Sequence, residues 1–144
     1  MGELAKRGHI DMVPDGFYHQ VASILDTARN KAYAAVNFAM VEAYWEIGRS
    51  VVEQQGGEGR AEYGEALLQG LAERLTADFG KGFDASNLRY MRQFYVAFPI
   101  RDALRHELSW THYRRLSRVP DADARIWYMN ECADSHWSTR QLER

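Results

Sequence analysis

The sequence has one cysteine, three prolines and no long apolar run. The single cysteine and the absence of a long apolar run each exclude a class of protein. Cys132 is the single cysteine, so an internal disulfide is excluded and a reducing cytoplasm is the expected compartment. No apolar run approaches the roughly 20 residues that span a bilayer, and the N-terminal residues lack the apolar core of a signal peptide. We therefore expect a cytoplasmic protein without a membrane partner.

Catalytic motifs are missing as well. The glycine-rich segment 56–59 lacks the Lys-Ser or Lys-Thr of a phosphate-binding loop, which predicts a connector. Nucleases of the PD-(D/E)xK type need an acid two residues before a lysine, where it holds a metal beside a charge-stabilising group. No lysine meets that condition, since Lys6, Lys31 and Lys81 follow Leu4, Arg29 and Phe79 at this offset. We expect no catalytic residue and no enzymatic activity within this chain.

Two pairs of potentially reactive side chains are explained by structural roles more simply than by metal binding or catalysis. Cys132 and His136 are four residues apart on a predicted helix, but a structural metal site needs two further ligands and none is evident. Ser109 and His112 invite comparison with a catalytic triad, yet no nucleophile elbow surrounds the serine and a helix cap explains it. The sequence therefore predicts no metal and no cofactor.

Charge is unevenly distributed along the chain, although the net charge is only −2. Residues 15–78 contain ten acids and five bases, whereas residues 81–118 contain eight bases and three acids. Such an asymmetry is typical of a localised anion-binding face. Chance clustering is the alternative, because arginine outnumbers lysine fifteen to three throughout the sequence.

Apolar periodicity predicts an all-α protein, a helical bundle with one long N-terminal helix and a helix-turn-helix-like unit. Residues 1–14 are expected to form a flexible arm, and residues 15–144 a single helical domain. The long helix is expected from Asp15 to about Gln54, with a break near Asn37 left open. Its predicted buried side consists of Phe17, Val21, Ile24, Ala28, Val36, Met40, Ala43, Ile47 and Val51.

Shorter helices are expected over about 61–79, 84–98, 109–119 and 120–135. Their predicted inner side chains are Leu67, Leu68, Leu71, Leu75, Phe79, Trp110, Tyr113, Leu116, Ile126, Trp127, Met129 and Cys132. Ser138 and Gln141 form a capping box, which predicts one more helix. Because that helix begins so close to Arg144, we expect the chain to be cut from a longer protein.

The stretch 79–98 carries the strongest functional signal. Gly80 and Gly82 predict a left-handed cap and a tight turn, and Asp84 or Ser86 is the expected N-cap of the next helix. That helix has an apolar stripe formed by Leu88, Met91, Tyr95 and Phe98. A helix, a short glycine turn and a second helix with a polar outer face are typical of a helix-turn-helix, although ordinary packing hairpins share the pattern.

The polar face of this helix carries side chains that can reach phosphates and base edges. The predicted DNA-binding residues are Asn87, Arg89, Arg92 and Gln93 on the helix, with Lys81, Arg114, Arg115 and Arg118 on phosphates. Aromatic residues beside these arginines, such as Tyr90 and Trp110, suit nucleic-acid stacking or a place in the core.

Six ordered landmarks resemble the N-terminal domain of the bacterial YhcG-type family. They are Tyr44-Trp45-Glu46-Ile47-Gly48-Arg49, Ala61-Glu62-Tyr63-Gly64, Phe79-Gly80-Lys81-Gly82-Phe83, Asn87-Leu88-Arg89 with Met91-Arg92-Gln93-Phe94-Tyr95, Leu108-Ser109-Trp110-Thr111-His112-Tyr113, and Trp137-Ser138-Thr139-Arg140-Gln141-Leu142. In that family a helical N-terminal domain precedes a nuclease domain of the PD-(D/E)xK type. The resemblance therefore implies a DNA-recognition or assembly module whose catalytic part lies beyond Arg144.

Two functions compete on the sequence alone. The first is a DNA-binding domain that delivers a C-terminal nuclease domain to its substrate. The second is an oligomerisation or partner-binding module that uses the long first helix, for example as a homodimer. The two are compatible, because a protein that binds symmetric DNA sites is often a dimer.

Overall fold

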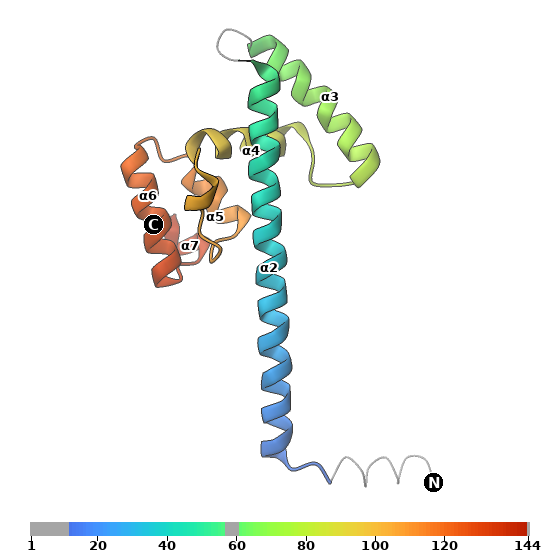
Figure 1. Ribbon diagram of the computed structural model, residues 1–144, viewed down its shortest axis with the longest axis vertical. Coiled ribbons are helices and arrows are strands. Elements are labelled where there is room, and N and C mark those ends of the chain that lie inside the picture. Colours follow the sequence, from blue (N-terminus) through green and yellow to red (C-terminus); the bar gives the residue numbers. More distant parts are fainter. Residues whose placement is uncertain (1–11, 57–60, 144) are drawn as a thin grey trace. The chain divides into compact units, whose positions relative to one another are not determined.

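A computed structural model describes residues 12–56 and 61–143. Within these ranges every regular element is a helix, which confirms the all-α prediction (Figure 1). The elements are α2 (Asp15–Gln55), α3 (Ala61–Phe79), α4 (Ala85–Ala97), the short 3-10 helix η1 (Arg101–Ala103), α5 (Trp110–Leu116), α6 (Ala122–Ser135) and α7 (Thr139–Leu142). The long N-terminal helix is therefore confirmed as well. Most of the predicted arm and of the predicted connector 56–59 lies outside the described residues.

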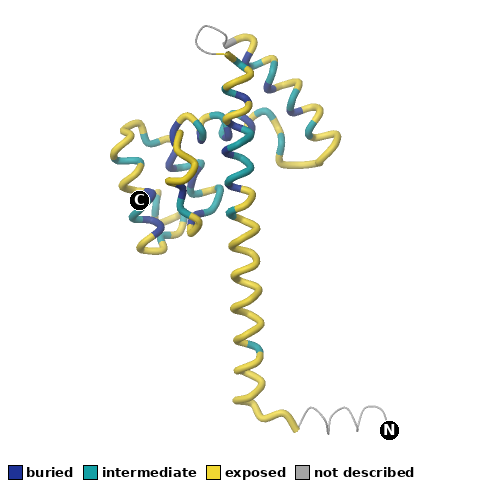
Figure 2. Tube along the Cα trace, in the orientation of Figure 1, coloured by how far each residue is buried: buried dark blue, intermediate teal, exposed yellow. Residues whose placement is uncertain are grey.

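Contacts divide the chain into two units, one up to Val36 and one from Asn37 onward, and α2 contributes to both. In the first unit every position of α2 except Ala22 is exposed (Figure 2). The prediction that Phe17, Val21 and Ile24 are buried is therefore wrong, because no other described element of this unit covers them. Ala28, Val36 and Met40 are exposed too.

The second unit buries one side of the C-terminal part of α2. Val41, Trp45, Gly48 and Val51 are the buried positions. Of the residues that were predicted to be buried in this part of α2, Val51 is buried, whereas Ala43 and Ile47 are only half-buried. Helical spacing was thus predicted correctly while the buried face was not, since several faces of this helix carry apolar residues.

The core of the second unit has two clusters. The larger cluster joins α2, α4, α5 and α6, and its fully buried members include Phe94, Tyr113, Leu116, Met129 and Cys132. The smaller cluster joins α2, α3 and α4 through Val51, Leu68, Ala72, Leu88 and Met91. Three residues predicted inside, Phe79, Ile126 and Trp127, are exposed because they lie at helix positions that no described element covers.

The α2–α4 crossing is unusually close because Gly48 has no side chain. A Cβ atom at this position would lie 2.1 Å from the backbone oxygen of Met91. One turn away, the Trp45 indole N–H donates a hydrogen bond to the Phe98 carbonyl oxygen at 2.6 Å, and its ring meets the Tyr95 ring edge-on. These contacts fix α4 against α2 and so fix which face of α4 stays open.

The turn before α4 follows the predicted chemistry. Gly80 and Gly82 have φ values of 85° and 106°, which glycine adopts without steric cost. The Asp84 side chain accepts a hydrogen bond from the Asn87 backbone N–H at 2.7 Å, so Asp84 rather than Ser86 is the N-cap. Helix α4 ends at Ala97, just before the Phe98-Pro99 pair that was expected to stop it.

Candidate nucleic-acid interface

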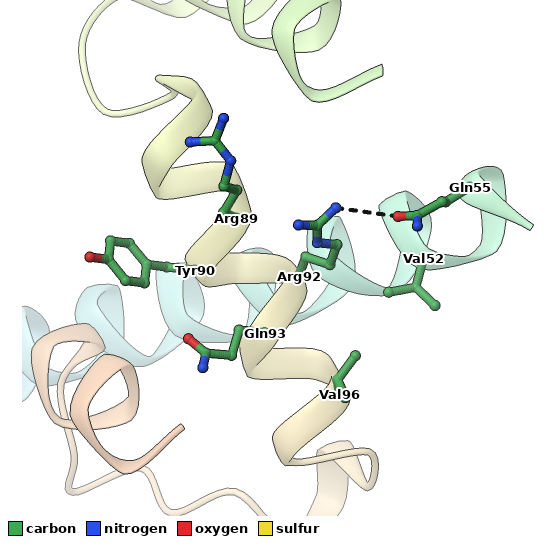
Figure 3. A pocket seen from close by; sticks show the side chains of 7 residues that line it. All are labelled: Val52, Gln55, Arg89, Tyr90, Arg92, Gln93 and Val96. Atoms are coloured by element: carbon green, nitrogen blue, oxygen red, sulfur yellow. Dashed lines mark hydrogen bonds between the residues drawn. The ribbon is translucent and has the colours of Figure 1, made fainter. Parts of the chain in front are cut away.

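The open side of α4 and the end of α2 enclose a surface hollow of about 760 Å³. Its lining residues are Val52, Gln55, Arg89, Tyr90, Arg92, Gln93 and Val96 (Figure 3). The hollow exists because Leu88, Met91 and Phe94 turn the opposite side of α4 into the core. Three of the predicted DNA-binding residues thus share one concave surface.

Asn87 has a structural role at the start of α4. Its amide nitrogen donates to the Gly82 carbonyl oxygen at 2.6 Å, and its amide oxygen accepts from the Trp110 indole at 3.3 Å. The side chain therefore braces the glycine turn against α5. Its predicted role on DNA stays a prediction.

Arg89 and Arg92 share one carboxylate, that of Glu65 on α3. Arg89 approaches it at 2.9 Å and Arg92 at 3.4 Å, and Arg92 also donates to the Gln55 side chain (Figure 3). Hydrogen bonding from Arg89 lowers the pKa of Glu65. Two guanidinium groups against one carboxylate leave this edge of the hollow with a net positive charge.

Tyr90 is the neighbour of two further arginines, both contributed by the segment at and after α5. The Arg114 guanidinium carbon lies 4.1 Å from the centre of the Tyr90 ring, and that of Arg118 lies 5.8 Å from it. Hydrogen bonding from Arg114, then from Arg118, lowers the pKa of Tyr90. Within the described residues neither arginine has a carboxylate partner, and the buried Nε of Arg114 has no hydrogen-bond acceptor.

The other predicted residues differ in their surroundings. Gln93 and Lys81 are exposed, whereas Arg115 is half-buried and pairs with Glu143 at 3.2 Å. The sequence missed Tyr90 as the ring that gathers the arginines, whereas Glu65 was one of three acids, with Glu62 and Glu73, considered as their ion-pair partners. Tyr90 was signalled by its place between Arg89 and Arg92, but Glu65 lies 24 residues from Arg89 and needs the fold to bring it close.

Several bases of segment 81–118 serve the fold instead. Arg101 pairs with Glu46 at 2.9 Å, and Arg105 pairs with Glu107 and Asp134. These partners raise the pKa of Arg105. The positive surface is therefore narrower than the charge count suggested and is concentrated on α4 and the end of α5.

The Ser109–His112 pair forms a helix cap rather than a reactive centre. His112 Nδ1 accepts the Ser109 backbone N–H at 3.2 Å, and His112 Nε2 lies 2.8 Å from the Trp137 carbonyl oxygen. Because Nδ1 accepts, the neutral ring carries its proton on Nε2 and donates it to that carbonyl. The predicted capping role of Ser109 is confirmed, and Ser138 with Gln141 forms the predicted capping box.

The described residues contain no group of three or more His, Cys, Asp or Glu side chains arranged to hold a metal ion. No described helix is long and apolar enough to cross a membrane.

Comparison with known proteins supports the resemblance seen in the sequence. The family model described as "DUF1016 N-terminal domain" matches residues 20–144. A protein of Escherichia coli (strain K12) named "Putative nuclease YhcG" is 36% identical over 165 aligned positions, which cover 92% of this chain and 43% of that protein. The chain thus spans less than half the length of this relative. No solved structure gives a significant match.

Proposed function

The chain belongs to the DUF1016 N-terminal domain family, and from this premise we propose that it is the DNA-binding module of a nuclease. The relative in Escherichia coli is named as a nuclease, and this chain corresponds to its N-terminal part. No catalytic motif is present in the chain, so the cleavage chemistry is assigned to a C-terminal nuclease domain. A cytoplasmic location is part of the proposal and is supported by the single cysteine.

The observation that carries the DNA-binding proposal is the position of Arg114 and Arg118 against the Tyr90 ring. Most other arginines of segment 81–118 are held by a carboxylate, but these two are held by an aromatic ring. A ring orients a guanidinium group without neutralising it, so both charges stay available to an anion. The anion that we propose is the phosphate of a nucleic-acid backbone, which arginine side chains commonly bind.

Helix α4 is proposed as the reading helix of a helix-turn-helix formed with α3. Gln93 is exposed beside Arg92 on the open side of α4, where an amide and a guanidinium group can both reach base edges. Arg89 is proposed to exchange Glu65 for a phosphate. That exchange costs little, because ion pairs with both partners this exposed contribute little to stability. Lys81 and Arg115 are proposed to contact phosphates at the margin.

A matched pair of double variants tests the proposal by fluorescence anisotropy on labelled duplex DNA at low salt. Arg92→Gln/Arg118→Gln removes two charges from the surface, and Arg29→Gln/Arg74→Gln removes two exposed charges from α2 and α3. We expect the first variant to bind DNA at least about tenfold more weakly than the wild-type chain, since it loses two charge-assisted contacts. Equal loss in both variants, or no binding by the wild-type chain, would contradict the proposal.

The open side of α2 favours a second function, assembly or partner binding. In the first unit Phe17, Ile24, Leu25 and Val36 are each more than half exposed, at 56%, 62%, 55% and 61%. Soluble proteins rarely leave a contiguous apolar surface of this kind without a partner. Analytical ultracentrifugation of the whole chain tests this function independently of DNA, and a single species of about 16.6 kDa at all concentrations would exclude self-assembly.

A further inference from the structure

The apolar residues of the first unit lie on one side of α2. With 3.6 residues per turn, each residue advances about 100° around the helix, which places the apolar side chains within roughly half of the circumference. The opposite half carries polar residues such as His19, Asp26 and Asn30. The apolar members are Phe17, Tyr18, Val21, Ile24, Leu25, Ala28, Ala32, Ala35 and Val36, and we refer to them as the α2 face.

Side-chain size changes along the α2 face. Its N-terminal half is large, with Phe17, Tyr18, Val21, Ile24 and Leu25, whereas its C-terminal half is dominated by alanines. Large side chains in one half of the face and small ones in the other are sterically complementary when one helix is reversed against another.

We propose that the α2 face pairs with the α2 face of a second copy of this chain, with the two helices antiparallel and crossing near Ala28. This proposal rests on the second function given above, assembly through α2, and it adds the partner and the geometry. In the antiparallel pair the large end of each helix lies against the alanine end of the other. Val21 then lies level with Ala35 of the partner and Ile24 with its Ala32, which allows close packing on both sides of the crossing.

A parallel pair packs the same side chains less well. It sets Phe17 against Phe17 and Leu25 against Leu25, so the helices are held apart at one end while the alanines face a gap at the other.

Disulfide trapping in the whole chain distinguishes the two geometries. Ala28→Cys is expected to cross-link to itself, since Ala28 lies at the crossing. Val21→Cys by itself is expected not to cross-link. The two Val21 positions of an antiparallel pair would be about 21 Å apart along the helix axis, well beyond the roughly 7 Å between Cα atoms that a disulfide spans. A mixture of Val21→Cys with Ala35→Cys is expected to give the mixed product. The matched control Asn30→Cys lies near the crossing on the polar side and is expected to remain free.

The native thiol does not interfere with this experiment, because Cys132 is buried and burial raises its pKa. Efficient self-linking of Val21→Cys would overturn the antiparallel geometry while leaving assembly through α2 intact. Cross-linking of Asn30→Cys as fast as Ala28→Cys would overturn the use of the α2 face.

Solution mass separates the geometry from assembly itself. We expect wild-type chain to have about twice its monomer mass at high concentration, Ile24→Glu to be monomeric, and Asn30→Glu to behave as wild type. Circular dichroism shows whether each variant keeps its helices. A monomeric wild-type chain would overturn both the pairing and the assembly function, whereas the DNA-binding proposal would be unaffected.

Discussion

Tyr113 is the residue on which the packing of segment 104–113 depends. Its ring is fully buried between Phe94 and Phe98, and its hydroxyl makes two hydrogen bonds to one backbone residue. It accepts the Arg105 N–H at 2.7 Å and donates to the Arg105 carbonyl oxygen at 2.8 Å. Burial is the main reason that the pKa of Tyr113 is raised well above its ordinary value. The hydroxyl therefore stays protonated and both bonds persist.

Removal of this hydroxyl is predicted to destabilise the fold. Tyr113→Phe leaves the Arg105 N–H without a partner among the described residues and the Arg105 carbonyl oxygen with only the Leu108 N–H at 3.4 Å, at a cost of about 1–3 kcal/mol in the free energy of unfolding. Urea denaturation followed by circular dichroism measures the change. Tyr128→Phe is the control, since Tyr128 is exposed, and it is expected to alter stability little. Equal stability of both variants would show that the two hydrogen bonds contribute nothing.

Tyr90 reports the charge of the proposed interface. Arg114 and Arg118 lower its pKa, so Arg114→Gln is predicted to raise the pKa toward the ordinary value of about 10. The phenolate absorbance, titrated in wild type and in the variant, measures the shift once the Tyr90→Phe titration is subtracted. An unchanged titration in Arg114→Gln would mean that this guanidinium group does not reach the phenol. Arg74→Gln is the matched control and is expected to leave the pKa of Tyr90 unchanged.

Residues that act locally were predictable from sequence, and residues that act across the fold were not. Ser109 and Ser138 cap helices whose N–H groups lie three positions away, so spacing alone located them. Asn87 was assigned to the polar face because its partner Trp110, 23 residues distant, is brought near only by the packing of α5. The same limit left the counter-charge open among Glu62, Glu65 and Glu73, of which Glu65 pairs with Arg89 and Arg92.

At the scale of the elements, the α2–α4 crossing depends on a glycine. Gly48→Ala is predicted to destabilise the protein, since the new Cβ would overlap the Met91 backbone and the helices must separate. Overpacking typically costs about 1–3 kcal/mol, which exceeds the gain of about 1 kcal/mol expected from replacing glycine by alanine in a helix.

Gly70→Ala in α3 is the matched test of that prediction. A Cβ at Gly70 meets no atom within 4 Å, so only the helix-propensity gain applies and stability is expected to rise. Thermal unfolding of the two variants should therefore shift in opposite directions. Stabilisation by both substitutions would show that α2 and α4 are not in close backbone contact.

Periodicity predicted the helices well but chose the wrong face of α2. The stripe that includes Phe17, Val21 and Ile24 has proper helical spacing, yet these residues are exposed, while Val41 and Gly48, which lie outside the stripe, are buried. A periodic stripe indicates that a helix has an apolar face, but not what covers it. An apolar face that packs against a second copy has the same sequence pattern as an apolar face that packs against the core.

At the scale of the whole molecule, function depends on which charges the fold leaves open. Arg101, Arg105 and Arg115 are engaged by acids, and their charge is largely offset. Arg114 and Arg118 are oriented by Tyr90, and Arg92 shares Glu65 with Arg89. Sequence could predict a basic region and the family. It could not separate structural arginines from available ones, because that distinction requires the positions of their partners.

Salt dependence of DNA binding tests the central proposal most directly. Each phosphate contact releases about 0.9 counterions from B-DNA, so the slope of log affinity against log salt counts the contacts. We predict that Arg114→Gln/Arg118→Gln reduces the magnitude of this slope by about two relative to wild type, whereas Arg29→Gln/Arg74→Gln leaves it unchanged. Identical slopes for wild type and both variants, or no binding by wild type at low salt, would contradict the assignment of DNA binding to this surface.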